Sequence, residues 1–129
     1  MPVDLARLRG VTLFTDLTDD DLGLIAEKME ERWVEPGEHL AREGASGYFF
    51  FVIFEGAVDI SRSGELLATL GPGEFFGETA ILETTRRTAT ATATAPTVVG
   101  AVFGADFAKI NQDAPELHAR IAQVMNERR

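Results

Sequence analysis

The sequence predicts a mainly β domain with helices at both ends, built as an antiparallel sandwich or barrel. From Trp33 onward, segments about seven to nine residues long are separated by turn residues, a pattern typical of short antiparallel strands. Before and after this region, apolar residues recur at helical spacing instead. With 129 residues, the chain fits one compact domain, residues 1–129. The separating turns are Pro36-Gly37, Gly44, Gly47, Gly56, Ser63-Gly64 and Gly71-Pro72-Gly73.

The first 32 residues are predicted to be helical. Gly10 interrupts a first apolar face, and Thr18 is placed to cap a second helix whose first turn carries three acidic residues. The apolar residues of this second helix are expected to pack against the rest of the domain. The two faces consist of Leu5, Leu8 and Val11, and of Leu22, Ile25, Ala26 and Met29.

Residues 33–103 supply the predicted strands. Residues 48–54 are aromatic or apolar at every position, which predicts a central strand buried on both sides or with one face covered by helices. A hairpin is expected at residues 61–65. Residues 88–95 alternate threonine with alanine, so this strand should have one face of each kind, and residues 97–103 form the last strand.

Residues 104–129 return to helical spacing. A helix at about residues 107–111 is followed by a second one, with Pro115 near its first turn. The apolar stripe of the last helix is narrow, as expected for a helix that docks on a groove or on a symmetry mate. Its predicted members are Leu117, Ile121, Val124, Met125 and Arg128.

The composition excludes several classes of function. Twelve basic against 21 acidic residues give a net charge of −9, which does not suit general binding to nucleic acid. The chain has no cysteine, and His39 and His118 are too few for a cupin-type metal site. We therefore expect no enzyme, no metal and no catalytic residues. No signal peptide or membrane-spanning run is apparent, so a cytoplasmic location without a membrane partner is the expectation.

One stretch, residues 73–82, combines features of an anion site with a carboxylate. Gly77 lets the backbone approach a ligand, and the following N–H groups favour an anion at a helix N-terminus. Arg87 can close on the same anion with its planar charged fork. Glu78 is placed where it can accept hydrogen bonds from sugar hydroxyls. Phosphate and sugar together suggest a nucleotide.

Strand parity selects Arg87 over Arg86 as the inward residue. Arg87 has the parity of the alanines at 89, 91 and 93, which should face the apolar interior. An isolated charge would be costly there, so an inward arginine calls for an anion. Arg86 is expected to be a solvated loop charge.

From about Leu13 to Val124, the chain resembles the cyclic nucleotide-binding domain shared by cAMP receptor-type regulators, regulatory subunits of cyclic nucleotide-dependent kinases and cyclic nucleotide-gated channels. Glu43-Gly44 and residues 48–56 are similar to the family's glycine turn and aromatic strand. Residues 76–82 with 87–90 are similar to its phosphate-binding cassette, here 73–90. The resemblance implies an antiparallel β jelly roll (double-stranded β-helix) in residues 33–103, with hinge and lid helices in 104–129.

The resemblance also implies a role for each matching residue. Glu78 would accept a hydrogen bond from the ribose 2′-hydroxyl, the backbone from Gly77 to Ala80 and Arg87 would hold the cyclic phosphate, and Thr88 would bear on purine choice. The ligand is expected to be cAMP rather than cGMP, with no other cofactor. The implied ligand-binding residues are Phe76, Gly77, Glu78, Thr79, Ala80, Arg87, Thr88 and Ala89, and the lid residues are Arg120, Val124, Met125 and Arg128.

Two functions remain open at this point. The first is a ligand-sensing regulatory domain that acts on an unidentified effector domain or protein. The second is a jelly roll that keeps the fold without nucleotide and serves protein interaction, with Glu78 and Arg87 paired to each other. A homodimer through the last helix is compatible with either. No helix-turn-helix follows the last helix, so direct nucleic acid binding is not expected.

Overall fold

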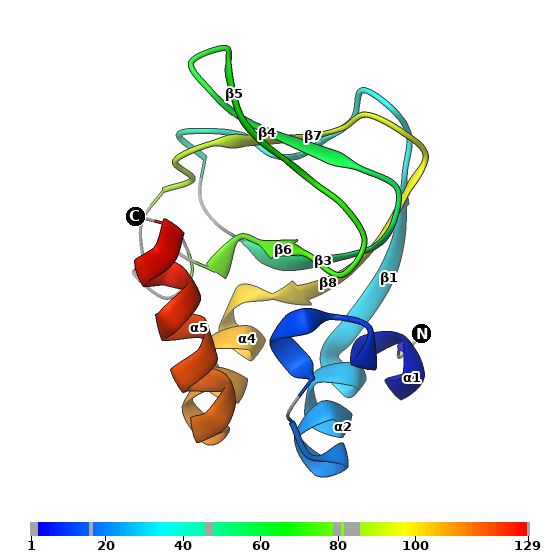
Figure 1. Ribbon diagram of the computed structural model, residues 1–129, viewed down its shortest axis with the longest axis vertical. Coiled ribbons are helices and arrows are strands. Elements are labelled where there is room, and N and C mark those ends of the chain that lie inside the picture. Colours follow the sequence, from blue (N-terminus) through cyan, green and yellow to red (C-terminus); the bar gives the residue numbers. More distant parts are fainter. Residues whose placement is uncertain (1–2, 16, 46–47, 79–80, 82–85, 129) are drawn as a thin grey trace.

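The computed structural model describes residues 3–15, 17–45, 48–78, 81 and 86–128. Two four-stranded antiparallel sheets lie face to face, and the helices gather against one of them (Figure 1). The first sheet has the strand order β1–β8–β3–β6 and the second β2–β7–β4–β5. This confirms the predicted mainly β fold with flanking helices. The strands are β1 (Met29–Val34), β2 (His39–Ala41), β3 (Phe49–Glu55), β4 (Val58–Arg62), β5 (Glu65–Leu70), β6 (Phe75–Phe76), β7 (Thr90–Ala93) and β8 (Thr97–Phe103).

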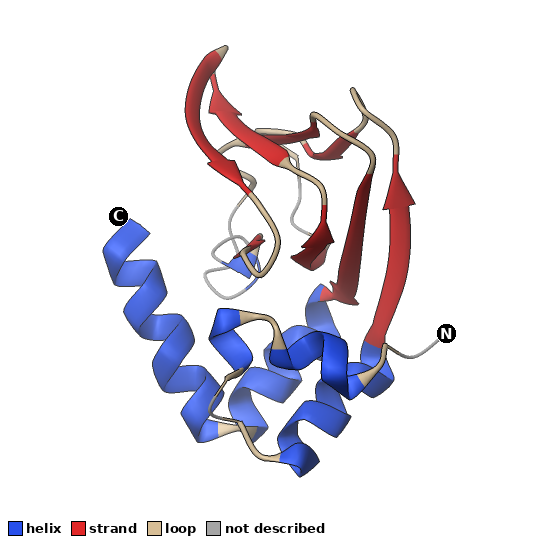
Figure 2. Cartoon of the chain, turned by 45° about the vertical axis from the view of Figure 1, so that its right-hand side comes forward, coloured by secondary structure: helices blue, strands red, loops and turns tan. Residues whose placement is uncertain are grey.

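The helices pack beside the first sheet at one end of the molecule (Figure 2). The predicted N-cap is present: the Thr18 hydroxyl accepts a hydrogen bond from the Asp21 amide, and three acidic residues fill the first turn of the helix that follows. Pro115 is the first residue of the last helix, as expected. The helical elements are α1 (Leu5–Arg9), the 3₁₀ helix η1 (Thr12–Phe14), α2 (Asp19–Lys28), α4 (Gly104–Asp113) and α5 (Pro115–Arg128).

Strand β3 separates two apolar cores. Phe50 and Val52 belong to the core shared with the helices, whereas Phe51 and Ile53 belong to the core between the two sheets. The uniformly apolar strand therefore has one face under helices and the other under a sheet. Its alternate side chains serve both cores because successive residues of a strand point to opposite faces.

The predicted helical N-terminal part is too long. Helix α2 ends at Lys28, and β1 starts at Met29 rather than at Trp33. All six residues of β1 pair with β8, from Met29 opposite Val102 to Val34 opposite Thr97. Met29 continues the helical apolar spacing by coincidence, because the first residue of the strand is buried in the same core as α2. Long-range pairing here overrides the local period.

The threonine–alanine strand is shorter than predicted. Only Thr90–Ala93 forms β7, and within it Ala91 and Ala93 are buried while the threonines lie on the other face. The alternation is thus confirmed over the strand itself. The predicted hairpin is also present, with Ser63 and Gly64 in the turn between β4 and β5 at φ of 52° and 81°. Helix α4 extends beyond the predicted 107–111 on both sides.

Candidate functional site

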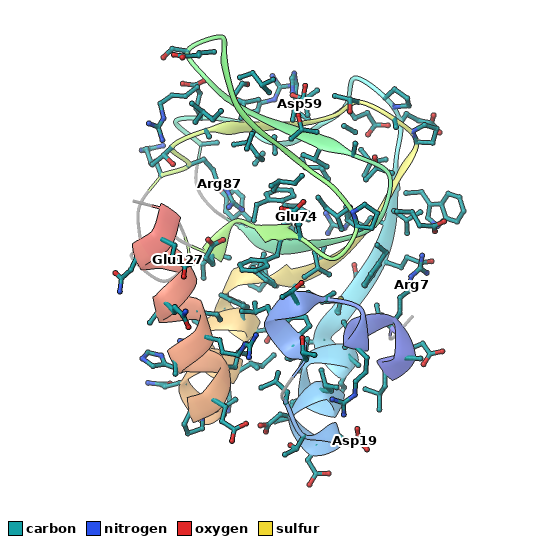
Figure 3. The ribbon with its side chains drawn as sticks, viewed as in Figure 1. Arg7, Asp19, Asp59, Glu74, Arg87 and Glu127 are labelled. Atoms are coloured by element: carbon teal, nitrogen blue, oxygen red, sulfur yellow. The ribbon has the colours of Figure 1, made fainter. Side chains whose placement is uncertain are left out.

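The Arg87 side chain enters the space between the two sheets (Figure 3). It is 8% exposed, and its Nη2 donates a hydrogen bond to the main-chain carbonyl of Phe49 on β3. Arg86, by contrast, is exposed and donates from Nη1 to the Gly44 carbonyl at 2.9 Å. The prediction that Arg87 rather than Arg86 faces inward is therefore confirmed, although Arg87 precedes β7 and is not part of it.

The backbone of Arg87 is held on both sides by the loop that follows β2. The Arg87 amide donates to the Ala45 carbonyl at 2.7 Å, and the Arg87 carbonyl accepts from the Gly44 amide at 2.8 Å. Two backbone hydrogen bonds to adjacent residues fix the orientation of the peptide groups on either side of the Arg87 Cα. The inward direction of the side chain follows from this pairing.

Gly77 lies directly against the guanidinium. Its φ of +99° is a conformation that L side chains rarely adopt. A Cβ at this position would lie 2.6 Å from Nη1 of Arg87 and 2.9 Å from the Phe49 carbonyl oxygen. Glycine therefore permits a close approach at this point of the chain, and the group that approaches it in this structure is the Arg87 guanidinium.

Glu78 brings an acidic group to the same place. Its side chain is 1% exposed. Burial lowers the pKa of the Arg87 guanidinium, and the Coulombic attraction of the Glu78 carboxylate acts in the opposite direction. Two opposite charges are therefore buried close together, next to Gly77. We call Gly77, Glu78 and Arg87 the charged cluster.

The other predicted ligand-binding residues lie around this cluster in different ways. Phe76 is buried and stacks on Phe51 with 5.0 Å between ring centroids, so it belongs to the core between the sheets. Thr88 is exposed, and its carbonyl accepts from Nε of Arg62 at 2.9 Å. Ala89 is half-buried. Thr79 and Ala80 lie outside the described residues, and with them two of the predicted backbone donors of the cassette.

The predicted lid helix docks on the helices of its own domain. Leu117 and Ile121 of α5 are buried in the core shared with α2 and β3. Arg120 donates from Nη2 to the Thr12 carbonyl of η1 at 3.1 Å, so this bond directs it to the N-terminal helices. The position of Arg120 above the base of a bound nucleotide stays a prediction. The side chains of Val124, Met125 and Arg128 lie outside what the structure describes.

Sequence reasoning missed the partners of Arg87. Phe49 contributes its main-chain carbonyl and not its ring, and Gly44 and Ala45 contribute backbone groups only. The Glu43-Gly44 pair predicts a turn, and Gly44 indeed has a φ of +82°. Nothing in side-chain identity, however, indicates which backbone a turn will pair with.

Both histidines lie at the surface of the protein. His39 is exposed and its Nδ1 lies 2.8 Å from the Thr92 hydroxyl, while His118 is exposed and its Nδ1 lies 2.9 Å from Nδ2 of Asn111. Within the described residues, no group of three or more histidine, cysteine or acidic side chains could hold a metal ion. No helix in the part of the chain described here is long and apolar enough to cross a membrane.

Comparison with known proteins gives one consistent family. The model of the cyclic nucleotide-binding domain matches residues 31–113. The chain is 33% identical over 98 residues to a cAMP-dependent protein kinase regulatory subunit of Eremothecium gossypii. The aligned region covers 76% of this chain and 21% of that protein. It is 35% identical over 88 residues to cGMP-dependent protein kinase 2 of Homo sapiens, covering 64% of this chain and 12% of the kinase. The chain thus spans about a fifth or less of these relatives.

A solved structure of similar length agrees in fold. It is that of a putative cyclic nucleotide-binding protein from Geobacter metallireducens GS-15, 26% identical, with a TM-score of 0.83. The match covers 94% of this chain and 91% of that one. The arrangement of two sheets, with helices formed by the N-terminal and C-terminal parts of the chain, is therefore that of the jelly-roll domains in this family.

Proposed function

We propose, since the chain belongs to the cyclic nucleotide-binding domain family, that it is a regulatory domain which binds a cyclic nucleotide between its two sheets. Domains of this family are regulatory rather than catalytic. The observation that carries the proposal is the charged cluster, in which a buried arginine and a buried glutamate lie against a glycine with positive φ.

The buried cation supports an anionic ligand. Removing a guanidinium from water costs free energy, and the hydrogen bond to the Phe49 carbonyl uses one of the five donors of its fork. A cyclic phosphate would accept from this fork in a charge-assisted pair. Glu78 would accept from the ribose 2′-hydroxyl, so that each buried charge meets its own part of the ligand.

The purine preference remains a prediction, with cAMP ahead of cGMP. One of the relatives named above is a cAMP-dependent kinase regulatory subunit and the other is a cGMP-dependent kinase. Thr88 follows Arg87 directly and is exposed. A competition titration of bound cAMP with cGMP measures the preference, and a Thr88→Ala variant shows how far the hydroxyl contributes to it.

A nucleotide titration tests the binding itself. Thermal unfolding is followed with cAMP, with cGMP and with 5′-AMP, which has the same base but no cyclic phosphate. At millimolar ligand, a micromolar site should stabilise the fold by about 4 kcal/mol. Stabilisation by a cyclic nucleotide and much less by 5′-AMP is expected. No stabilisation by either cyclic nucleotide would refute the proposal.

One observation favours a second candidate, a domain of this fold that acts through protein contacts without nucleotide. Arg87 already donates to the Phe49 carbonyl, and its charge is partly balanced by Glu78. The cluster is therefore held in place without a ligand. A negative titration with an intact fold would select this candidate.

The structure suggests a route from the site to the helices. The carbonyl that holds Arg87 belongs to Phe49, and the next residue, Phe50, stacks on Phe107 of the hinge helix α4 with 4.2 Å between centroids. When a phosphate competes for Arg87, the end of β3 is released and α4 can shift. We propose that α4 then carries α5 towards the base, a population shift between two arrangements.

Hydrogen exchange of α5 tests this movement. Residues 114–128 are compared with and without cyclic nucleotide, and slower exchange with ligand is expected because the helix gains contacts over the base. Helix α2, which belongs to the core below the sheet, serves as the internal reference. Equal protection of α5 in both states would contradict a lid.

The remaining partners are proposals of the same kind. The two relatives named above are a regulatory subunit of a kinase and a kinase, which supports a role in controlling an effector domain or protein. The cytoplasmic location, the homodimer through the last helix, and the absence of nucleic acid and membrane partners remain predictions from the sequence.

A further inference from the structure

Glu43, which is outside the charged cluster, joins three separate segments of the chain. Its Oε1 accepts a hydrogen bond from the Ser63 amide at 2.9 Å, in the turn between β4 and β5. Its own amide donates to the Thr90 hydroxyl at 3.1 Å, at the start of β7. The residue therefore links the loop after β2 to the β4–β5 turn and to the start of β7.

The two residues after Glu43 hold the backbone of Arg87. Gly44 donates to the Arg87 carbonyl, and Ala45 accepts from the Arg87 amide. Two arginines add further bonds to the same junction: Arg86 donates to the Gly44 carbonyl, and Arg62 to the Thr88 carbonyl. The position of residues 43–45 therefore sets the position of Arg87.

Ser63 shows that the bond to Glu43 also fixes the turn. It is the non-glycine residue with positive φ among those that the structure describes, at 52°. A left-handed conformation is unfavourable for serine, so it persists where surrounding contacts impose it. The Glu43 carboxylate supplies such a contact by accepting from the Ser63 amide.

We propose that Glu43 is a positioning residue for the anion site: it holds residues 43–45 between the β4–β5 turn and β7 and thereby keeps Arg87 aimed between the sheets. This inference rests on the proposed function, because the anion in question is the cyclic phosphate. Glu43 itself touches no ligand. Its carboxylate acts as a hydrogen-bond acceptor, and its charge is of the wrong sign to attract a phosphate.

Because the charge of Glu43 is negative, electrostatics and positioning predict opposite effects of its removal on binding. Removing an acidic group near an anion site should strengthen binding if only electrostatics matters. If Glu43 positions Arg87, Glu43→Ala should instead weaken cyclic nucleotide binding by about three- to tenfold, the value of one hydrogen bond. Glu43→Gln keeps an acceptor oxygen and loses the charge, so its affinity should equal or exceed that of the wild type.

A matched control is available in the turn between β1 and β2. There the Glu38 carboxylate accepts from the Glu35 amide at 3.2 Å, a bond of the same kind in a turn that does not hold Arg87. Glu38→Ala is expected to leave the affinity for cAMP and cGMP unchanged. The inference would be overturned if Glu43→Gln bound cyclic nucleotide as weakly as Glu43→Ala does. It would also be overturned if Glu43→Ala bound more tightly than the wild type.

A second measurement needs no nucleotide. Amide exchange of the ligand-free protein should become faster at Arg87 and Ser63 in Glu43→Ala and be restored in Glu43→Gln, with little change in Glu38→Ala. If this pattern appears while the wild type binds no cyclic nucleotide, the geometry is right and the proposed function is wrong. Unchanged exchange at Arg87 in Glu43→Ala refutes the positioning role even where the wild type binds.

Discussion

An Arg87→Met variant is expected to bind cyclic nucleotide at least about a hundredfold more weakly than the wild type and still to fold. A charge-assisted hydrogen bond contributes about 1.5–3 kcal/mol, and the fork can make two to one phosphate, while each 1.4 kcal/mol is tenfold in affinity. Calorimetric titration with cAMP and cGMP measures the loss.

The ligand-free variant should also be less stable than the wild type. Methionine fills much of the same volume and removes a cation whose burial is unfavourable, as its lowered pKa indicates. Against this, the Phe49 carbonyl loses its donor, and the buried Glu78 carboxylate loses the opposite charge beside it. The losses outweigh the gain, so the ligand-free unfolding temperature should fall, and only the wild type should gain stability with nucleotide.

Arg86→Met is the matched control for this variant. Arg86 is adjacent, carries the same charge and is exposed, and its removal costs one hydrogen bond to the Gly44 carbonyl, so the affinity should fall by about tenfold or less. This comparison separates a specific contact with phosphate from the general loss of positive charge in an acidic protein. An equal loss in both variants, or full affinity in Arg87→Met, would contradict the assignment of Arg87.

The inward orientation of Arg87 shows how far sequence could reach. Parity with the buried Ala91 and Ala93 predicts the correct direction, yet the strand that the parity assumes starts only at Thr90. The actual cause is the backbone pairing with Gly44 and Ala45. Side-chain pattern carries information about which face is buried, whereas backbone pairing between distant loops leaves no mark in residue identity.

The fold was predictable from side-chain pattern in the same way. The errors in that prediction arise where pairing between distant segments decides the structure. The turns and apolar strands identify a sandwich because their pattern is local. The start of β1 at Met29 depends on pairing with β8, about seventy residues away in sequence, and local helical spacing misassigns it. The bond from Arg120 to the Thr12 carbonyl likewise depends on how α5 docks, which the apolar stripe alone does not determine.

A Gly77→Ala variant is expected to lose both stability and nucleotide affinity. The positive φ costs an alanine about 1–2 kcal/mol, and crowding in a packed interior adds about 1–3 kcal/mol. The guanidinium could move aside from the new methyl group. The Phe49 carbonyl oxygen, 2.9 Å from the new Cβ, belongs to the backbone of a central strand and cannot move aside.

Gly37→Ala isolates the conformational part of this loss. Gly37 has a φ of +92°, nearly that of Gly77, but a Cβ there would meet nothing within 4 Å. Denaturant unfolding should therefore show about 1–2 kcal/mol of destabilisation for Gly37→Ala, with unchanged affinity for cAMP. Gly77→Ala should be less stable than this control and should bind at least tenfold more weakly, because the methyl group displaces the arginine that the phosphate requires. Equal destabilisation of the two variants together with equal affinity would mean that Gly77 serves the turn alone and that the close approach to Arg87 has no part in binding.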